Sequence, residues 1–220
     1  AAISHDLLQP LHAAQLFAHA LDERMTHEQY RPLLGNLRGA LGSTEALLGG
    51  LLDISRLDTG RLQVQIEDFP LAQVLDPMVA EFRVVAAEAG IALHHVPTAA
   101  WVRSDPQQLR RILMNFISNA VRYTERGRGL VGMRRRGGLL HIEVWDSGPG
   151  VSERERRTIF DEFRRGEDAR GQGLGLGLAI AERIARLLGH PLQLRSWPGR
   201  GSMFSVAVPL APTGQAIADP

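Results

Sequence analysis

The chain has 220 residues, a formal net charge of +1 and 44% hydrophobic residues. This length suits one large domain or two small ones, with ample apolar side chains for a core. A charge near zero gives no reason to expect binding to nucleic acid or lipid, and the absence of cysteine excludes disulfides and thiolate chemistry. No apolar run reaches the roughly 18 residues that span a bilayer, so we expect a cytoplasmic segment without direct membrane contact.

Residues 1–61 have the pattern of a helical hairpin. Because the chain begins inside this pattern and without Met, we expect a longer protein in which any sensor or membrane anchor lies upstream. A seam at alternating four- and three-residue steps consists of Leu7, Leu11, Ala14, Ala18, Leu21 and Met25, then Leu37, Leu41, Thr44, Leu48 and Leu51. Pro32 suits the start of the second helix and Gly60 its C-cap. Since two helices alone cannot enclose a core, the pattern predicts a homodimer that closes a four-helix bundle.

After Gly60 the pattern changes to that of an α+β sandwich, with helices on a mixed sheet, over residues 62–210. Leu62, Val64 and Ile66 alternate with glutamines, which predicts a half-buried strand. The other predicted strands form two hairpins, at 130–135 with 139–146 and at 192–195 with 202–208. Residues 211–220 are typical of a tail or linker.

Helices are predicted to cover this sheet. The first has an apolar stripe from Leu75 to Ala86 and ends at Gly90. The second begins at Pro106, after a cap at Ser104 or Asp105. The third follows a glycine run and ends at Gly189. The residues expected inside the last two helices are Leu109, Ile112, Leu113, Phe116, Ile117, Ile180, Ile184, Leu187 and Leu188.

Polar residues fall together on one face of the second of these helices, at Asn115, Asn119, Arg122 and Tyr123. The two amides can offer oxygens to Mg²⁺ and donors to phosphate. Arg122 can neutralise phosphate charge, and Tyr123 can lie against a nucleotide. Taken alone, such a pattern is more often a solvated helix face.

Asp146 ends a predicted strand and precedes Ser-Gly148-Pro-Gly150. A carboxylate at this place can accept a hydrogen bond from an exocyclic amine such as that of adenine. The glycines would let the backbone approach the ring closely. The alternative is an ordinary turn between a strand and a loop, which Asp and Gly also favour.

A glycine run follows, with Gly173, Gly175 and Gly177 alternating with leucines up to Leu178, just before a helix. Free backbone N–H groups at a helix N-terminus can bind an anion, here a triphosphate. The alternative is a flexible linker, but leucines between the glycines argue against it. No Gly-Lys-Ser/Thr follows, so this is not a Walker A loop.

A candidate phosphate acceptor lies near the start of the chain, in Ser4-His5-Asp6-Leu-Leu-Gln9-Pro10. A neutral imidazole nitrogen is a competent nucleophile toward a γ-phosphoryl group. Asp6 can hold the proton of the other ring nitrogen, and Pro10 should kink the helix near the acceptor. The other histidines are interpreted as ordinary surface residues. An ATP site and an acceptor on one chain suggest phosphoryl transfer to histidine.

In this order, the motifs resemble those of the sensor histidine kinases of two-component systems, within the wider class that includes DNA gyrase and the heat-shock chaperone ATPases. The resemblance covers nearly the whole chain. The matching segments are His5 (H box), 115–124 (N box), 146–150 (first glycine box), 160–163 (F box), 173–178 (second glycine box) and the glycine-rich end at 199–204.

This resemblance implies that Asn115 and Asn119 contact Mg²⁺ and the phosphates of ATP, and that Asp146 binds adenine. Residues from about 164 to 172 would form a lid. It further implies a phosphorelay, in which His5 is phosphorylated and the phosphoryl group passes to an aspartate in the receiver domain of a response regulator.

Some positions differ within the class or from the common pattern. The ATPase relatives carry Glu at the position of Asn115, as general base for water, whereas Asn cannot take a proton and so favours transfer to a protein acceptor. The commonest H box has Glu where Asp6 stands, and Asn or Thr where Gln9 stands. The second of these helps to orient water for dephosphorylation of the partner, so Gln9 puts phosphatase activity in question. Arg122 replaces the usual Lys.

The sequence therefore predicts the catalytic core of a dimeric protein-histidine kinase, an enzyme of signal transduction. Residues 1–61 would form the dimerisation and phosphotransfer domain and residues 62–210 the ATP-binding domain, with a pivot near 60–62. Two alternatives stay open. One is a degenerate kinase that acts as a regulatory binding module, which the altered H box allows. The other is an ATPase that clamps a substrate, which Asn115 opposes.

Overall fold

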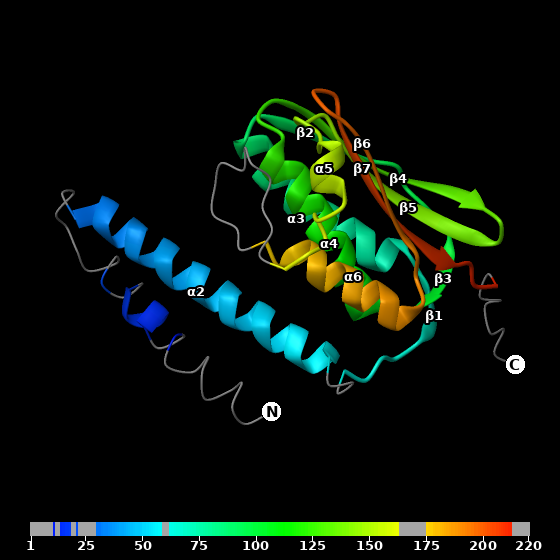
Figure 1. Cartoon of the computed structure of the whole chain (residues 1–220), viewed down its shortest axis with the longest axis horizontal. Helices are drawn as coiled ribbons and strands as arrows, with labels where there is room; N and C mark the ends of the chain where they lie inside the picture. Colours follow the sequence, from blue (N-terminus) through cyan, green and yellow to red (C-terminus); the bar gives the residue numbers. More distant parts are fainter. Residues whose placement is uncertain are drawn as a thin grey trace, which may run out of the picture.

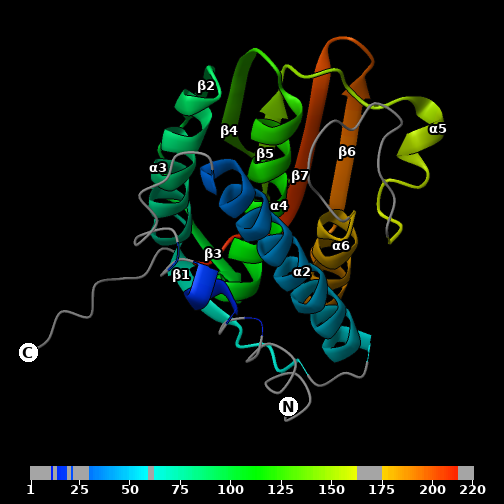
Figure 2. The ribbon, with the colours of Figure 1, turned by 90° about the vertical axis from the view of Figure 1, so that its left-hand side faces the viewer.

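The computed structural model of the chain describes residues 11, 14–18, 21, 30–58, 62–162 and 175–212. A long helix, α2 (Arg31–Asp58), lies beside a body in which helices cover a sheet (Figure 1). Seen from the side, α2 runs along the helix-covered face of that body and packs against α6 (Gly177–Leu188) (Figure 2). Within the described ranges, no helix is long and apolar enough to span a bilayer.

The body is built on a five-stranded mixed sheet with the order β2-β4-β5-β7-β6. β2 and β4 are parallel, and the other neighbours in this sheet are antiparallel. A separate two-stranded antiparallel sheet pairs β1 with β3. The strands are β1 (Glu67–Pro70), β2 (Ile91–His95), β3 (Trp101–Ser104), β4 (Gly127–Arg136), β5 (Leu139–Asp146), β6 (Leu192–Trp197) and β7 (Gly201–Pro209).

Helices α3 (Ala72–Glu88), α4 (Pro106–Tyr123) and α6 pack on one face of the five-stranded sheet (Figure 2). The ring of Phe116 on α4 stacks on Phe204 of β7, with the ring centroids 5.4 Å apart. The α4 residues predicted to face the core are all fully buried, namely Leu109, Ile112, Leu113, Phe116 and Ile117. The predicted architecture of helices on a mixed sheet is confirmed.

Local sequence signals set the ends of these helices, as predicted. Asp105 caps α4, because its side chain accepts hydrogen bonds from two backbone N–H groups in the first turn. Pro106 takes the first helical position, where its missing N–H costs nothing. Gly189 ends α6 with a φ of 68°, the left-handed conformation that glycine adopts without strain.

The prediction of a strand at Leu62, Val64 and Ile66 is wrong. These residues form no strand, and β1 begins only at Glu67, which pairs with Ser104 of β3. A strand needs a partner in register, and alternation of apolar residues in the sequence does not supply one.

Other elements were missed or placed differently. Leu187, predicted inside α6, is 41% exposed, because α6 buries a narrower stripe. The strands β2 and β3 and the short helix α5 (Glu153–Arg156) were not predicted. Each has four or five residues, which is too short for a periodic signal, and a capping box between Ser152 and Glu155 fixes α5 instead.

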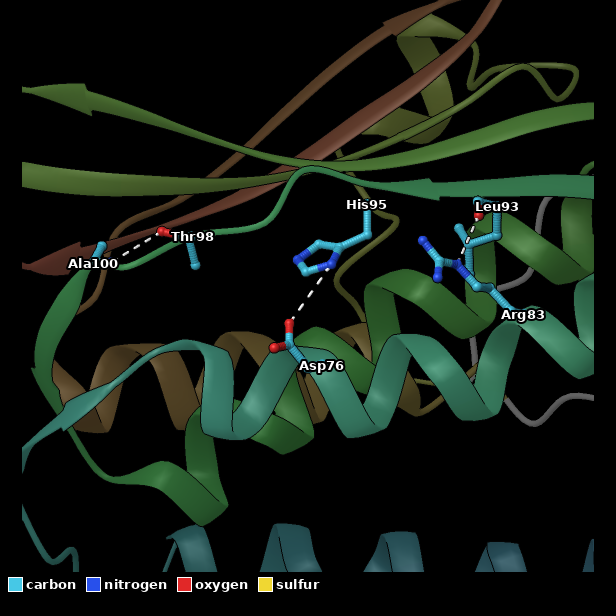
Figure 3. A network of polar contacts seen from close by, with 6 residues as sticks. All are labelled: Asp76, Arg83, Leu93, His95, Thr98 and Ala100. Carbon is cyan, nitrogen blue, oxygen red and sulfur yellow. Dashed lines mark hydrogen bonds and ion pairs between the residues drawn. The ribbon is translucent and has the colours of Figure 1, made fainter.

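Two histidines that were interpreted as surface residues are in fact largely buried and connect elements of the body. His190 is 5% exposed, and its Nε2 lies 2.8 Å from Ser104 Oγ, a contact that joins the end of α6 to the end of β3. His95 lies at the end of β2, with Nδ1 3.7 Å from Asp76 Oδ1 on α3 (Figure 3). Burial lowers the pKa of His95, and the Asp76 carboxylate acts in the opposite direction.

Candidate functional site

The predicted site residues meet at one end of the body, where β5 ends beside α4 and α6 begins. Gly148 lies against the last turn of α4, since a Cβ there would be 2.9 Å from Tyr123 O. Gly177 lies against Asn115, whose Oδ1 a Cβ at Gly177 would overlap. Motifs that are far apart in the sequence therefore line one site.

Asp146 is held in a fixed orientation at the end of β5. Its Oδ1 accepts hydrogen bonds from the backbone N–H of Gly148 at 2.8 Å and of Ser202 at 3.2 Å. Burial raises the pKa of the Asp146 carboxyl, and these two hydrogen bonds act in the opposite direction. Both amides bind Oδ1, and no residue in the described ranges donates a hydrogen bond to the other oxygen, Oδ2, which can therefore accept one from a ligand.

The loop after Asp146 approaches its neighbours so closely that side chains would not fit. A Cβ at Gly148 would lie 3.0 Å from Asp146 Oδ1, and one at Gly150 would overlap Trp197 O. Gly150 also has a φ of 74°, which disfavours any other residue. The two glycines therefore let the loop pack closely against the end of α4 and the end of β6, beside the carboxylate.

The polar face of α4 lies next to this loop. Asn115, Asn119 and Tyr123 are half-buried, and Arg122 is exposed. Asn115 Nδ2 donates a hydrogen bond to Arg111 O at 2.9 Å, which leaves Oδ1 toward Gly177. The Arg122 guanidinium carbon lies 5.8 Å from the centroid of the Tyr123 ring. The amide oxygen of Asn115 is therefore preset beside the start of α6.

The N-terminus of α6 completes the site. No described side chain caps it, so the first backbone N–H groups of the helix are open to an anion. Leu176 is 3% exposed and Leu178 packs against the core, while Gly175 has a φ of 67°. The two leucines therefore anchor the described part of the glycine run, residues 175–178, to the body.

Some predicted site residues lie outside the described part of the chain. These are His5, Asp6 and Gln9 of the phosphoacceptor segment, and Gly173 of the glycine run. The predicted lid at about 164–172 lies there as well. Their roles stay predictions.

Sequence reasoning assigned no role to two buried serines beneath Asp146. Ser202 donates its N–H to Asp146 Oδ1, and its Oγ lies 2.9 Å from Ser196 Oγ. The register of the β6–β7 hairpin pairs these two serines directly. A serine on each side of the turn at 198–200 was the available signal, but only the register of the strands shows that Asp146, Ser202 and Ser196 lie side by side across the sheet.

Two protein families match the chain. Residues 1–60 match the His Kinase A (phospho-acceptor) domain. Residues 104–212 match the family described as Histidine kinase-, DNA gyrase B-, and HSP90-like ATPase. The second match contains the α4, β5 and α6 residues that line the site.

Curated relatives are similar over nearly the whole chain. The sensor histidine kinase RcsC of Escherichia coli K12 is 29% identical over 96% of this chain and 23% of the relative. The autoinducer 2 sensor kinase/phosphatase LuxQ of Vibrio cholerae is 29% identical over 96% of this chain and 26% of the relative. The sensor-like histidine kinase SenX3 of Mycobacterium bovis is 31% identical over 94% and 52%. The chain thus spans about a quarter of the length of the first two relatives.

Solved structures share the fold. Full-length ShkA in complex with AMPPNP matches with a TM-score of 0.80 and 27% identity, over 96% of this chain and 45% of that one. The Acinetobacter baumannii histidine kinase AdeS matches with a TM-score of 0.68 over 94% of this chain and 98% of that one. Its identity is 21%, so it supports the fold alone.

Proposed function

Because the chain belongs to the sensor histidine kinases of two-component systems, we propose that it is the catalytic core of such an enzyme. In this core, ATP phosphorylates His5, and the phosphoryl group then passes to an aspartate in the receiver domain of a response regulator. The observation that supports this best is the close approach of Asn115 to Gly177 beside the Asp146 loop. That arrangement suits a nucleotide with its base at one end of the site and its phosphates at the other.

The donors and acceptors of the site fit ATP. Asp146 Oδ2 can accept a hydrogen bond from the exocyclic amine of adenine, since Oδ1 is bound by the backbone N–H groups of Gly148 and Ser202. The uncapped N-terminus of α6 can bind phosphate oxygens. Arg122 can neutralise their charge, and Tyr123 can lie against the nucleotide.

The amide oxygens of Asn115 and Asn119 would hold Mg²⁺ together with phosphate oxygens and water, which are the ligands that this ion prefers. The hydrogen bond from Asn115 Nδ2 to Arg111 O supports this role, because it fixes which atom of the amide is offered. Within the described ranges, no group of three His, Cys, Asp or Glu side chains could hold a metal. When bound, the ion neutralises charge on the transferring phosphoryl group.

At the acceptor, a neutral nitrogen of His5 would attack the γ-phosphorus and ADP would leave. Asp6 would hold the proton on the other ring nitrogen, and Gln9 would influence any later dephosphorylation of the partner. His5 is far from the ATP site along the chain, so the two domains must move or meet across a homodimer. We place the pivot at residues 60–62 and the reaction in the cytoplasm, where ATP and receiver domains are found.

The decisive experiment incubates the chain with γ-labelled ATP and Mg²⁺ and compares the wild type with His5→Gln. We expect an acid-labile, base-stable label on the wild type and none on the variant. His12→Gln, one heptad further along the same predicted helix, is the matched control and should still be labelled. The labelled protein should then lose its label to an isolated receiver domain.

Other outcomes of this experiment separate the alternatives. ATP binding without any label would argue for a regulatory binding module. Release of inorganic phosphate without protein label would argue for an ATPase. Asn119→Ala should abolish nucleotide binding whether the chain is a kinase, a binding module or an ATPase. Retained binding in that variant would contradict the proposed site.

A further inference from the structure

Ser196 on β6 lies beneath the Asp146 loop and is 3% exposed. Its Oγ accepts a hydrogen bond from the backbone N–H of Val151 at 2.6 Å. The same Oγ lies 2.9 Å from Ser202 Oγ and 3.3 Å from Gly201 O. One hydroxyl therefore contacts the loop on one side of Asp146 and the start of β7 on the other.

Both of these segments donate to the same carboxylate oxygen. Gly148 in the loop and Ser202 in β7 give their N–H groups to Asp146 Oδ1, at 2.8 Å and 3.2 Å. Gly148 and Val151 lie in the same loop, which follows Asp146. By holding Val151 and Ser202, Ser196 fixes the two segments that together orient the carboxylate.

Ser196 is itself held, and its hydrogen-bonding capacity is used. Arg156 of α5 donates to its backbone oxygen. A hydroxyl can donate once and accept twice. Here Val151 uses an acceptor site, and the single proton goes to Ser202 Oγ or Gly201 O. Loss of the hydroxyl would leave the Val151 N–H without this partner, a loss that the loop can relieve only by moving.

We propose that Ser196 is a positioning residue for base recognition, which sets the orientation of Asp146 and thereby the preference of the site for adenine over 6-oxopurines. The inference rests on the proposed function, since it assumes that Asp146 accepts a hydrogen bond from the exocyclic amine. A 6-oxopurine has a carbonyl oxygen in place of that amine, and a carboxylate repels it. Discrimination of this kind requires that the carboxylate does not turn.

The test measures the affinities of the whole chain for ATP and for inosine triphosphate, with Mg²⁺, by calorimetric titration. The preference is the affinity for ATP divided by the affinity for inosine triphosphate. We expect Ser196→Ala to lower this ratio about tenfold, mainly through weaker ATP binding. Ser196→Cys, which keeps a weaker donor and acceptor, should give an intermediate ratio. Ser205→Ala is the matched control, because Ser205 is a serine of β7 that is only 2% exposed, and it should leave the ratio unchanged.

A double-mutant cycle with Asp146→Asn distinguishes a role of Ser196 in orienting Asp146 from a general disturbance of the site. In a chain that already carries Asp146→Asn, Ser196→Ala should leave the ratio unchanged. An unchanged ratio for Ser196→Ala alone, or an equal fall in both backgrounds, would overturn the inference. A wild type that binds neither nucleotide would overturn the proposed function instead. If Ser196→Ala does not fold, Ser196→Cys takes its place. Its ratio should then fall in the wild-type background and stay unchanged in the Asp146→Asn background.

Discussion

At the scale of single residues, Asp146 is under two opposing influences. Burial raises the pKa of its carboxyl, while hydrogen bonds from Gly148 and Ser202 act to lower it, and burial has the larger effect. The folded state therefore binds the proton more readily than the unfolded chain. The contribution of this group to the free energy of unfolding is present at low pH and is lost as the pH rises through the raised pKa. At neutral pH the carboxylate costs stability, which is typical of a residue kept for binding.

The substitution Asp146→Asn should lower the affinity for ATP at least about tenfold without lowering Tm at neutral pH. The amide keeps an oxygen for Gly148 and Ser202, but it turns an N–H₂ group toward the amine of adenine. Any gain in Tm should shrink in acid, because the wild-type carboxyl is then neutral as well. Calorimetric titration and thermal unfolding at neutral and acidic pH test both parts. A strongly reduced Tm at neutral pH would contradict this account of Asp146.

At the scale of elements, Gly50 is the residue of α2 that allows close packing against the body. A Cβ at Gly50 would lie 2.9 Å from Leu176 Cδ1 and 3.6 Å from Ile180 Cδ1, so this glycine lets the start of α6 come close. Ile54, one turn further along α2, is 7% exposed. Leu176 directly precedes Gly177, so the contact between α2 and the body lies next to the proposed nucleotide site.

Gly50→Leu should push α6 away from α2 and separate the long helix from the body. Gly49→Leu is the control, because nothing lies within 4 Å of a Cβ at Gly49. Both substitutions improve helix propensity by a similar amount, so a difference between them reports the contact. We expect a larger radius of gyration in small-angle X-ray scattering for Gly50→Leu alone. Equal radii of gyration for the two variants would show that the contact at Gly50 does not hold the body against α2.

The elements that could be predicted from the sequence are those with local signals. α4 combines a stripe of apolar residues with an N-cap at Asp105 and a proline at its first position, and these signals agree with one another. The turn between β4 and β5 contains Gly137 and Gly138, whose φ values of 58° and 78° suit a tight hairpin. The polar residues proposed for the site come from contiguous motifs of the same local kind, and their roles stay predictions.

The rest depends on pairing between distant segments, which no local pattern encodes. Residues 62–66 alternate like a strand, but the partner strand β3 pairs only from Glu67 onward. β2 is parallel to β4 and lies at the sheet edge, although β3 and α4 separate these two strands in the sequence. Ser196 reaches the Asp146 loop only through the register of β6 with β7. These contacts arise from the assembled fold.

At the scale of the whole molecule, α2 has two different apolar faces. One face carries Ile54 and packs against the body. The other carries Leu33, Leu37 and Leu51, which are 67%, 45% and 43% exposed. Exposed leucines that recur along one face of a long helix are typical of a seam that another helix covers. This supports the predicted homodimer, in which the hairpins of two chains form a four-helix bundle.

Leu37→Glu should therefore convert the predicted dimer to a monomer, because the four-helix bundle would have to bury a carboxylate from each chain. ATP binding should persist, since the body has a buried core of its own around α4. Light scattering gives the mass and calorimetric titration gives the affinity, with Val84→Glu on the exposed part of α3 as the control. A dimeric Leu37→Glu would contradict the seam. A monomer that binds ATP normally but no longer labels His5 would show that the dimer is needed for phosphoryl transfer and not for assembling the nucleotide site.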